Sequence, residues 1–281
     1  MQIQTLVQDI YSYIQEHDDG WLSDAGKVLA AREVYNSNSR KGTLRLSALG
    51  PKCPRALWHS IHQPELAEAL PPYAKFKYGY GHMIEAAVVS LAKLTGHEVT
   101  GEQDELIVDG IVGHRDCVID GCVVDVKSAS TYSFAKFKDK SIGDNDPFGY
   151  LEQLDAYLLG SSGDDLVQIK DKAYLLAIDK QLGHMCLYEH TGRPDHIQER
   201  IVEYKRIVAR TEPPACNCGT VADGKSGNIK LDVRASYSAQ KHTCFPNLRT
   251  FLYASGPVYL TQVARKPDVP EIDRHGRVVY S

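Results

Sequence analysis

The sequence lacks the features that send a chain to a membrane or out of the cell. No apolar run approaches the length of a membrane span, and the opening residues, MQIQTLVQDIYSYIQEHDD, lack the basic and then apolar plan of a signal peptide. We therefore expect a cytoplasmic protein with no membrane partner. An excess of positive charge is also absent. The formal net charge is -4 at pH 7, so any nucleic-acid site must be a local basic patch on an acidic body.

Signatures of several enzyme classes are missing too. The chain contains no Gly-x-Ser-x-Gly elbow and no His-Glu-x-x-His zinc pair. Residues 219–226, GTVADGKS, match the letters of a phosphate-binding P-loop, but such a loop must follow a buried strand and open a helix. Here TEPPACNC precedes and GNIKLDVR follows, so we interpret the segment as a polar loop. A P-loop nucleotide hydrolase would depend on this segment only, and absence of ATP binding would exclude it.

The periodicity predicts an α/β (α+β) fold. Helical spacing runs through residues 2–35 and 78–95, and strand patterns lie at 105–108, 111–119, 122–128 and 172–179, with helices at about 149–160 and 194–210. This order predicts a mixed central sheet in αβββαβ order flanked by helices, with an irregular, cysteine-containing C-terminal segment. We expect one globular unit: a helical region at 1–70, a core at 71–211 and a C-terminal segment at 212–281 packed on the core.

Two carboxylates are predicted to face each other within the strand region. Asp120 and Gly121 form a two-residue turn that pairs position 119 with 122, and therefore Asp116 with Asp125. Strand alternation puts both acids and Lys127 on one side. Opposed like charges destabilise a sheet, and a divalent cation between them would remove the repulsion. The alternative is that both acids are solvated on an exposed face. The other side is the predicted core face: Cys117, Ile119, Cys122, Val124 and Val126.

Polar pairs on the neighbouring helices add to this pattern. His82 and Glu85 lie three residues apart on one helix face, and either could supply a further ligand or orient a metal-bound water. Gln153 and Tyr157 stand one helical turn apart. Taken singly, each of these residues is an ordinary surface or partly buried side chain.

Taken together, these segments resemble the PD-(D/E)XK nuclease superfamily, and most closely its RecB-like branch. GHMIE (81–85), GHRD (113–116), DVK (125–127) and QLDAY (153–157) occur in the order of that family's four motifs. A Gln-x-x-x-Tyr signature after the Asp-x-Lys marks the branch. The resemblance covers residues 78–180. More loosely, LRTFLYASGPVYLTQV and SGNIKL are similar to segments of exonucleases of this branch encoded by bacteriophages.

The resemblance implies a role for each carboxylate and its neighbours. Asp116 and Asp125 would bind the metal, with the backbone carbonyl of Val126 as an extra ligand. Lys127 would help activate the attacking water or stabilise charge on the scissile phosphate. Glu85 and His82 would complete the metal shell. Gln153 and Tyr157 would steady the site or contact the DNA backbone.

The implied activity is a Mg²⁺- or Mn²⁺-dependent deoxyribonuclease that hydrolyses phosphodiester bonds from DNA ends. Metal ions held by carboxylates neutralise charge on the phosphate and supply a deprotonated water, and a nearby lysine adds a cation. Phage recombination, replication or DNA degradation is the expected setting, with phage recombination or replication proteins as partners and the host cytoplasm as location. The alternatives are a structure-dependent endonuclease and a catalytically silent DNA-binding scaffold. Oligomeric state is not predicted.

Lysines interleaved with aromatic residues flank the candidate site on both sides. Such runs suit tracking of a DNA backbone and stacking on bases, although a charged, solvated loop has the same composition. The second run falls in a segment, 131–147, that we expect to be a basic, polar loop. The candidate DNA-binding residues are Lys75, Lys77, Tyr80, Lys136, Lys138 and Lys140.

The seven cysteines are an odd number in a reducing compartment, where free thiols or metal ligands are expected rather than a disulfide framework. Several RecB-like nucleases hold an iron–sulfur cluster with one N-terminal and three C-terminal cysteines. LGPKCPRALWH resembles the first element, with Cys53 as its cysteine. The C-terminal part departs from that pattern, because Ala235 and Ser238 stand where a Cys-x-x-Cys pair is expected.

Other cysteines remain near the C-terminal end. Cys244 is present, Cys216 and Cys218 could substitute for the missing pair, and His242 is close in sequence. A rearranged iron–sulfur cluster or a zinc site therefore stays open, but Cys-x-Cys matches the usual zinc spacing poorly. The sequence favours a metal-free remnant. Three further cysteines are expected to be inert apolar residues: Cys117, Cys122 and Cys186.

Overall fold

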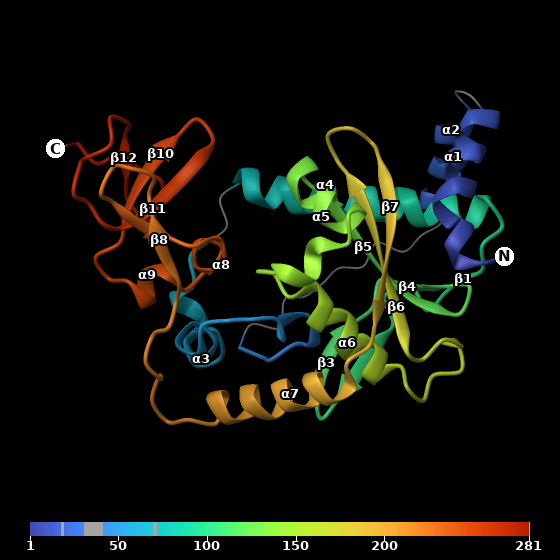
Figure 1. Cartoon of the computed structure of the whole chain (residues 1–281), viewed down its shortest axis with the longest axis horizontal. Coiled ribbons are helices and arrows are strands. Elements are labelled where there is room, and N and C mark those ends of the chain that lie inside the picture. The colour runs from blue at the N-terminus through green and yellow to red at the C-terminus, as the bar shows by residue number, and fades with distance from the viewer. Residues whose placement is uncertain (18–19, 31–41, 70–71, 281) are drawn as a thin grey trace. The chain divides into compact units, whose positions relative to one another are not determined.

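The computed structural model describes residues 1–17, 20–30, 42–69 and 72–280. They form helices and strands in the mixed order that the sequence predicts (Figure 1). The helical pattern expected over residues 2–35 appears as two helices, α1 (Leu6–His17) and α2 (Gly20–Ala30), and residues 31–35 lie outside the described residues. Within the described residues, no helix is both long and apolar enough to span a membrane.

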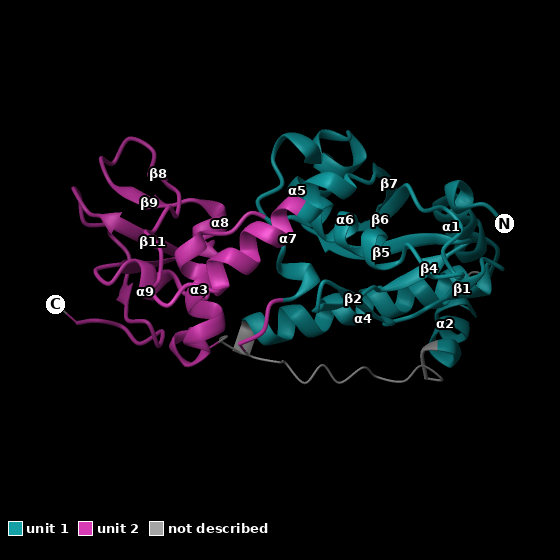
Figure 2. Cartoon of the chain, turned by 90° about the horizontal axis from the view of Figure 1, so that it is seen from below, with its two compact units in different colours: residues 1–38, 45–50, 71–198 teal, residues 39–44, 51–70, 199–281 magenta. Residues whose placement is uncertain are grey.

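Two compact units divide the chain (Figure 2). Unit 1 comprises residues 1–38, 45–50 and 71–198, and unit 2 comprises residues 39–44, 51–70 and 199–281. Besides α1 and α2, unit 1 contains η1 (Ile3–Thr5), η2 (Leu46–Ala48), α4 (Pro72–Leu94), β1 (Val99–Thr100), β2 (Glu105–Val108), β3 (Ile111–His114), β4 (Cys117–Ile119), β5 (Cys122–Ala129), α5 (Thr131–Lys138), η4 (Ser141–Asp144), α6 (Tyr150–Gly160), β6 (Lys172–Asp179), β7 (Met185–Thr191) and the start of α7 (Pro194–Val208). The remainder of α7 belongs to unit 2, with α3 (Pro54–His62), η3 (Pro64–Leu66), β8 (Thr220–Ala222), β9 (Ile229–Leu231), α8 (Val233–Ser236), α9 (Lys241–Cys244), β10 (Arg249–Tyr253), β11 (Gly256–Gln262) and β12 (Glu271–Ile272).

A mixed five-stranded sheet forms the centre of unit 1, in the order β1-β4-β5-β6-β7. β5 and β6 are parallel and are joined by a crossover that contains α5 and α6, whereas the other pairs are antiparallel. Parallel neighbours require such a crossover, and strands covered on both faces are long apolar runs. The segment KAYLLAID, which forms β6, is of this kind. The predicted mixed sheet flanked by helices is confirmed.

Helices cover both faces of this sheet. α1 and α4 pack on the face that carries Cys117, Ile119, Cys122, Val124 and Val126, as the sequence predicts. Each buried Val, Leu or Ile side chain contributes about 1.5–3 kcal/mol relative to exposure to water. On the opposite face, α6 packs against β5 and β6 and brings Gln153 into contact with Asp125. The face of β5 that holds the charged residues is therefore covered by a helix.

Two Asp-Gly turns fix the register of the short strands. Asp109 and Gly110 have φ of 50° and 78°, and Asp120 and Gly121 have φ of 49° and 73°. Two successive residues with positive φ are typical of the two-residue hairpin turn whose twist matches that of the strands. Ile119 pairs with Cys122, as expected.

Arg115 divides the strand that the sequence predicted over residues 111–119. The structure has two strands there, since β3 pairs with β2 in a separate two-stranded sheet while β4 joins the central sheet. The side chain of Arg115 is 1% exposed, and its guanidinium nitrogens lie 2.8 Å from an Asp104 oxygen and 2.6 Å from an Asp164 oxygen. It also donates a hydrogen bond of 3.2 Å to Ser161 Oγ. The alternating pattern did not reveal this break.

Two further helical segments differ from the sequence prediction. α4 begins at Pro72, so the lysines and tyrosines of KFKYGY belong to the helix that carries the GHMIE segment. The predicted loop over 131–147 is wrong in its first half, because residues 131–138 form α5. Ser130 caps this helix by accepting a hydrogen bond from the backbone N–H of Ser133, as an N-cap serine does.

Unit 2 contains an antiparallel five-stranded sheet in the order β12-β10-β11-β9-β8. It therefore has more regular structure than the sequence pattern indicated. Among its buried apolar side chains, Leu231, Ala235 and Leu248 form a cluster, and Cys218, Phe245 and Tyr259 pack against it. The P-loop-like letters at 219–226 form β8 and a turn toward β9, with no helix at that point, as the polar-loop interpretation requires.

Candidate active site

Asp125 is a fully buried carboxylate in the middle of β5. Its side chain is 1% exposed, and its Oδ2 atom lies 2.6 Å from Nζ of Lys127. Its Oδ1 atom accepts a hydrogen bond of 3.0 Å from Nε2 of Gln153 on α6. The alternative in which this acid is solvated on an exposed face is therefore wrong for Asp125. Both carboxylate oxygens are held by side chains that the sequence had singled out.

The surroundings of Asp125 disfavour its ionised form. Its pKa is raised to about 7, mainly by burial and also by the charges of Asp116 and Glu85, while Lys127 acts in the opposite direction. A carboxylate close to two others and away from water is costly, because its hydration is lost and like charges repel. Burial also lowers the pKa of Lys127, but Asp125 and Asp116 raise it by more, so the net shift is upward and the ammonium group stays charged.

Asp116 lies between β3 and β4, just before the first residue of β4. Its Oδ2 atom accepts a hydrogen bond of 2.8 Å from the backbone N–H of Val126. The register of β4 and β5, in which Cys117 pairs with Val124, puts Asp116 beside the half of β5 that holds Asp125. The backbone N–H of Val126 thus bonds to the Asp116 side chain and not to a backbone carbonyl of β4. This contact brings the Asp116 carboxylate close to Asp125.

Glu85 reaches this group of acids from α4. Its Oε1 atom accepts a hydrogen bond of 3.1 Å from Nε2 of Gln103, and its other oxygen lies 3.7 Å from Nδ1 of His82. The side chain of His82 is 81% exposed, whereas that of Glu85 is 14% exposed. Glu85 is therefore the member of this pair that faces the acids, and His82 lies at the solvent side.

Gln153 and Tyr157 act as one group on α6. The amide nitrogen of Gln153 donates to Asp125 and also, at 2.7 Å, to the Tyr157 hydroxyl oxygen. Tyr157 is 2% exposed, and burial, with the charges of Asp125 and Asp116, raises its pKa well above the ordinary value. The tyrosine therefore remains protonated, and its position fixes the rotamer of the amide that touches Asp125. The polar pair predicted one helical turn apart is in contact.

Three residues near the acids were not singled out from the sequence. Gln103 binds Glu85 through its side chain, and its backbone N–H donates a hydrogen bond of 3.1 Å to the carbonyl of Asp116. Arg115 anchors the chain directly before Asp116. The ring of Tyr150 lies 5.3 Å from Nζ of Lys127, a cation–π distance. The only signal was a charged residue, Arg115, within an apolar strand pattern; nothing marked the other two.

The three acids of this site are less tightly gathered than the cysteines described below. Among the described residues, the four cysteines have ligand atoms that all lie within 4.8 Å of one another, whereas Asp116, Asp125 and Glu85 do not form such a group. Their donor chemistry suits a hard divalent cation, since Mg²⁺ and Mn²⁺ prefer carboxylate and carbonyl oxygens. The pKa of Asp125 is raised mainly because burial disfavours its ionised form, and the neighbouring acids Asp116 and Glu85 add to this shift.

The candidate DNA-binding residues lie on, or directly after, two helices of unit 1. Lys75, Lys77 and Tyr80 are exposed on the first half of α4, next to exposed Phe76 and Tyr78. Lys136 and Lys138 lie on α5, and Lys140 follows it in the left-handed region with φ of 63°. Residues two apart on a helix point in different directions, so Lys136 and Lys138 do not lie on one side of the chain as the alternating sequence suggested. Lys136 instead lies 5.2 Å from the Tyr132 ring.

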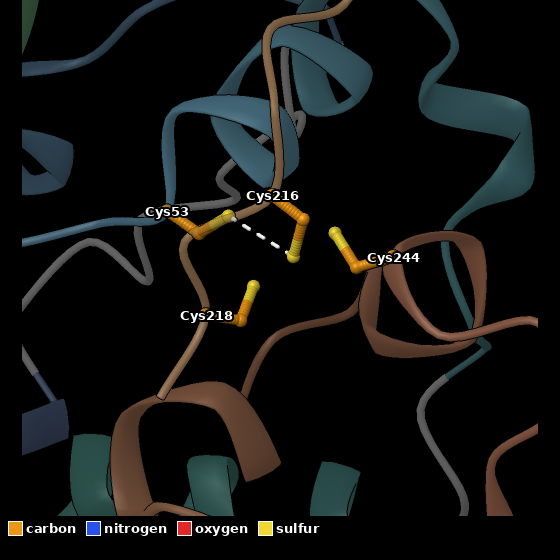
Figure 3. Close-up of side chains that lie close together, drawn as sticks. All are labelled: Cys53, Cys216, Cys218 and Cys244. Atoms are coloured by element: carbon orange, nitrogen blue, oxygen red, sulfur yellow. Dashed lines mark hydrogen bonds between the residues drawn. The ribbon is translucent and has the colours of Figure 1, made fainter. Parts of the chain in front are cut away.

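Four cysteines of unit 2 lie together, apart from the acidic site in sequence. The sulfur atoms of Cys53, Cys216, Cys218 and Cys244 are all within 4.8 Å of one another, and they point toward a common centre (Figure 3). All seven cysteines lie in described segments and are free thiols. His242 is not a member of this group, because its ring lies 3.0 Å from a Glu68 oxygen. Burial raises the pKa of both Cys122 and Cys186 to about 11, in keeping with their expected inertness.

Comparison with known proteins gives distant structural similarity. No family model and no curated protein matches the chain. Among solved structures, the chain is similar to an alkaline exonuclease from Laribacter hongkongensis, with 15% identity and a TM-score of 0.42 over 66% of this chain and 91% of that one; its complex with dAMP gives the same values. A phage-related exonuclease from Haemophilus somnus has 15% identity and a TM-score of 0.40 over 61% and 95% of the two chains.

Proposed function

We propose that the chain is a Mg²⁺- or Mn²⁺-dependent DNA exonuclease of the RecB-like branch of the PD-(D/E)XK nucleases. The observation that carries the proposal is the buried group on β5: Asp125 between Lys127 and Gln153, with Asp116 beside it on the backbone of Val126. Burial of a carboxylate next to two other acids costs free energy of folding, because hydration is lost and like charges repel. A site that binds a cation would account for this arrangement.

The donor set fits a divalent cation. Asp116, Asp125 and Glu85 would hold it through carboxylate oxygens, and the carbonyl of Val126 would add a neutral ligand, because the N–H and C=O of one strand residue point to the same neighbour. A bound divalent cation supplies charge neutralisation on the phosphate and a water of lowered pKa. His82, at the solvent side of Glu85, would orient that carboxylate.

Lys127 would supply the fixed positive charge of the site. Its ammonium group keeps its proton, because Asp125 and Asp116 raise its pKa. Held against Asp125 and the Tyr150 ring, it has few conformations to lose when a phosphate arrives. A cation fixed in this way stabilises negative charge that develops on the scissile phosphate without reorganisation of solvent.

Gln153 and Tyr157 would hold Asp125 in the orientation that the reaction needs. The amide donates to one carboxylate oxygen and so fixes the rotation of the group, and the tyrosine hydroxyl fixes the amide. With α6 packed over this face of β5, the pair also excludes water from the protein side of the carboxylate. The other carboxylate oxygen faces Lys127.

DNA ends are the proposed substrate, with the exposed lysines and tyrosines of α4 and the lysines at and after α5 as contacts to the DNA backbone and bases. An exonuclease digests linear DNA and leaves covalently closed circles intact, whereas an endonuclease nicks the circles. Incubation of both substrates with Mg²⁺, with Mn²⁺ and with EDTA tests the proposal. Metal-dependent loss of linear DNA alone supports it, nicked circles indicate the endonuclease, and binding without cleavage under either metal indicates a silent scaffold.

A further inference from the structure

The four cysteines of unit 2 are spaced so that all four sulfur atoms could bind one metal ion. All four sulfur atoms lie within 4.8 Å of one another, and those of Cys53 and Cys216 are 3.8 Å apart. For a Zn–S bond of about 2.3 Å, tetrahedral geometry separates neighbouring sulfurs by about 3.8 Å. The group is therefore close to the dimensions of one tetrahedral ion before any ligand adjusts.

An iron–sulfur cluster, which the RecB-like resemblance implies, does not fit this group as well. In a cubane cluster each thiolate binds a different iron and points away from its corner, so the four sulfurs stand much farther apart than around one ion. The Cys-x-Cys segment also departs from the family pattern, which has Cys-x-x-Cys where this chain has Ala235 and Ser238. This group therefore has four cysteines, as that pattern does, but their sulfur atoms lie closer together than a cubane cluster requires.

Local backbone structure brings the sulfurs to one centre. Cys53 is the N-cap of α3, where the positive end of a nine-residue helix favours a thiolate. Cys216 and Cys218 lie in a segment without regular secondary structure ahead of β8. Both thiols of this Cys-x-Cys pair nevertheless lie within 4.8 Å of the other two sulfur atoms, so the spacing allows both to face one centre. Cys244 is the last residue of α9.

The cysteine group lies next to buried apolar residues of unit 2. One buried apolar cluster of this unit contains Leu231, Ala235 and Leu248, and Cys218 packs against it. A metal ion that joins segments distant in the sequence adds its binding free energy to the stability of the folded unit. The four cysteines join three segments of unit 2: the start of α3, the chain before β8 and the end of α9.

We propose that Cys53, Cys216, Cys218 and Cys244 bind one structural Zn²⁺ ion that holds unit 2 together, in place of an iron–sulfur cluster. Four protein thiolates fill the coordination sphere, so the ion has no open position for water or substrate and takes no part in hydrolysis. Zn²⁺ is preferred because four thiolates in a tetrahedron suit its charge and its lack of geometric demand. The sequence had favoured a metal-free remnant, and it had no means of showing that the four thiols meet.

The first test uses the unmodified full-length chain, purified without oxygen from cells supplied with both zinc and iron. Elemental analysis is expected to give about one zinc ion per chain and no iron, with no visible absorbance from an iron–sulfur cluster. A mercurial reagent that blocks thiols is expected to release that zinc. Bound iron with labile sulfide, one iron without zinc, a metal-free protein or a Cys53–Cys216 disulfide would each overturn the proposal.

A second test separates coordination from folding. Growth with Co²⁺ in place of Zn²⁺ is expected to give the intense ligand-field spectrum of a tetrahedral tetrathiolate site, in a parent chain whose fold is not at risk. Cys218→Ser and Cys244→Ser are expected to lose most of the bound zinc and to unfold unit 2 at a lower temperature. Cys186→Ser, which removes a thiol of unit 1 on β7, is the matched control and is expected to keep its zinc. Equal zinc in all three variants would contradict the assignment, as would an octahedral cobalt spectrum. The metal content is read without any activity assay, so the outcome is independent of the proposed nuclease.

Discussion

The carboxylate of Asp125 lies 2.6 Å from Nζ of Lys127, and the two side chains leave the same face of β5. Because they are two residues apart on one strand, the pair needs no distant segment to form it. What the fold adds is burial: α6 covers this face and lets Gln153 take the second carboxylate oxygen. The pair is therefore local in sequence, whereas its altered proton affinity is a property of the whole unit.

Lys127→Met is expected to lower the rate of DNA cleavage by about 100-fold or more, because it removes the only side-chain ammonium that pairs with Asp125 in the described structure. DNA binding should change by much less. Single-turnover cleavage of end-labelled DNA and a binding titration in EDTA measure the two effects. Lys172→Met is the control, since Lys172 also pairs with a carboxylate, Glu189, but the pair is exposed. A nearly full cleavage rate in Lys127→Met would contradict the role given to Lys127.

Gln153→Leu is expected to reduce cleavage more than Tyr157→Phe does. The glutamine touches Asp125 directly, while the tyrosine acts through it. Tyr157→Phe leaves one N–H of the amide without its partner, at a cost of about 1–3 kcal/mol in stability. Urea denaturation and cleavage rates of both variants separate these effects. Equal rates in Gln153→Leu and the parent chain would show that the amide does not position the carboxylate.

Stability of the metal-free protein should fall as the pH rises toward neutrality, through Asp125. Burial raises its pKa from 3.8 to about 7, so between these values the folded chain holds a proton that the unfolded chain releases. The contribution is fully present below about pH 4 and is lost as the pH passes about 7. Between pH 5 and pH 8, the free energy of unfolding of the parent should therefore fall by up to a few kcal/mol more than that of Asp125→Asn.

Urea denaturation in EDTA at the two pH values measures this difference. Asp165→Asn, which changes an exposed carboxylate of the same unit, controls for the general effect of removing one acid. The prediction is wrong if Asp125→Asn and Asp165→Asn change with pH in the same way.

Arg115→Met is expected to destabilise unit 1 by about 3 kcal/mol, because it removes the buried partner of Asp104 and Asp164. The loss should also lower the cleavage rate, since Arg115 anchors the chain directly before Asp116. Arg206→Met, at an exposed position of α7, is the control. Thermal denaturation measures the stability effect. A melting temperature equal to that of the control would show that the buried guanidinium is dispensable.

The central hairpin and its acids could be predicted because the necessary information is local. The Asp120-Gly121 turn sets a register, alternation assigns faces, and both follow from residues within one short stretch. The long helix and the buried strand β6 were predictable for the same reason. Their periodicity extends over more residues than turns or loops can imitate.

Other features depend on contacts between distant residues. The break at Arg115 results from its pairing with Asp104 and Asp164, and no spacing rule connects Arg115 with Asp164. Helix α5 was predicted as a loop because lysines hid its two buried residues, Phe134 and Phe137. The gathering of Cys53 with thiols more than 160 residues away could not be read from the sequence, where the Cys-x-Cys spacing argued against it.

The account depends most on Asp125 and Asp116, and one measurement tests both. The parent chain, Asp125→Asn, Asp116→Asn and the control Asp165→Asn are compared for release of nucleotides from end-labelled linear DNA with Mg²⁺, Mn²⁺ or EDTA, with DNA affinity measured in parallel. We expect metal-dependent digestion by the parent and the control, a loss of about 1,000-fold or more in both site variants, and affinities that stay within a few-fold. Undiminished digestion by Asp125→Asn, or a parent that binds DNA and cuts it under neither metal, would contradict the proposed active site.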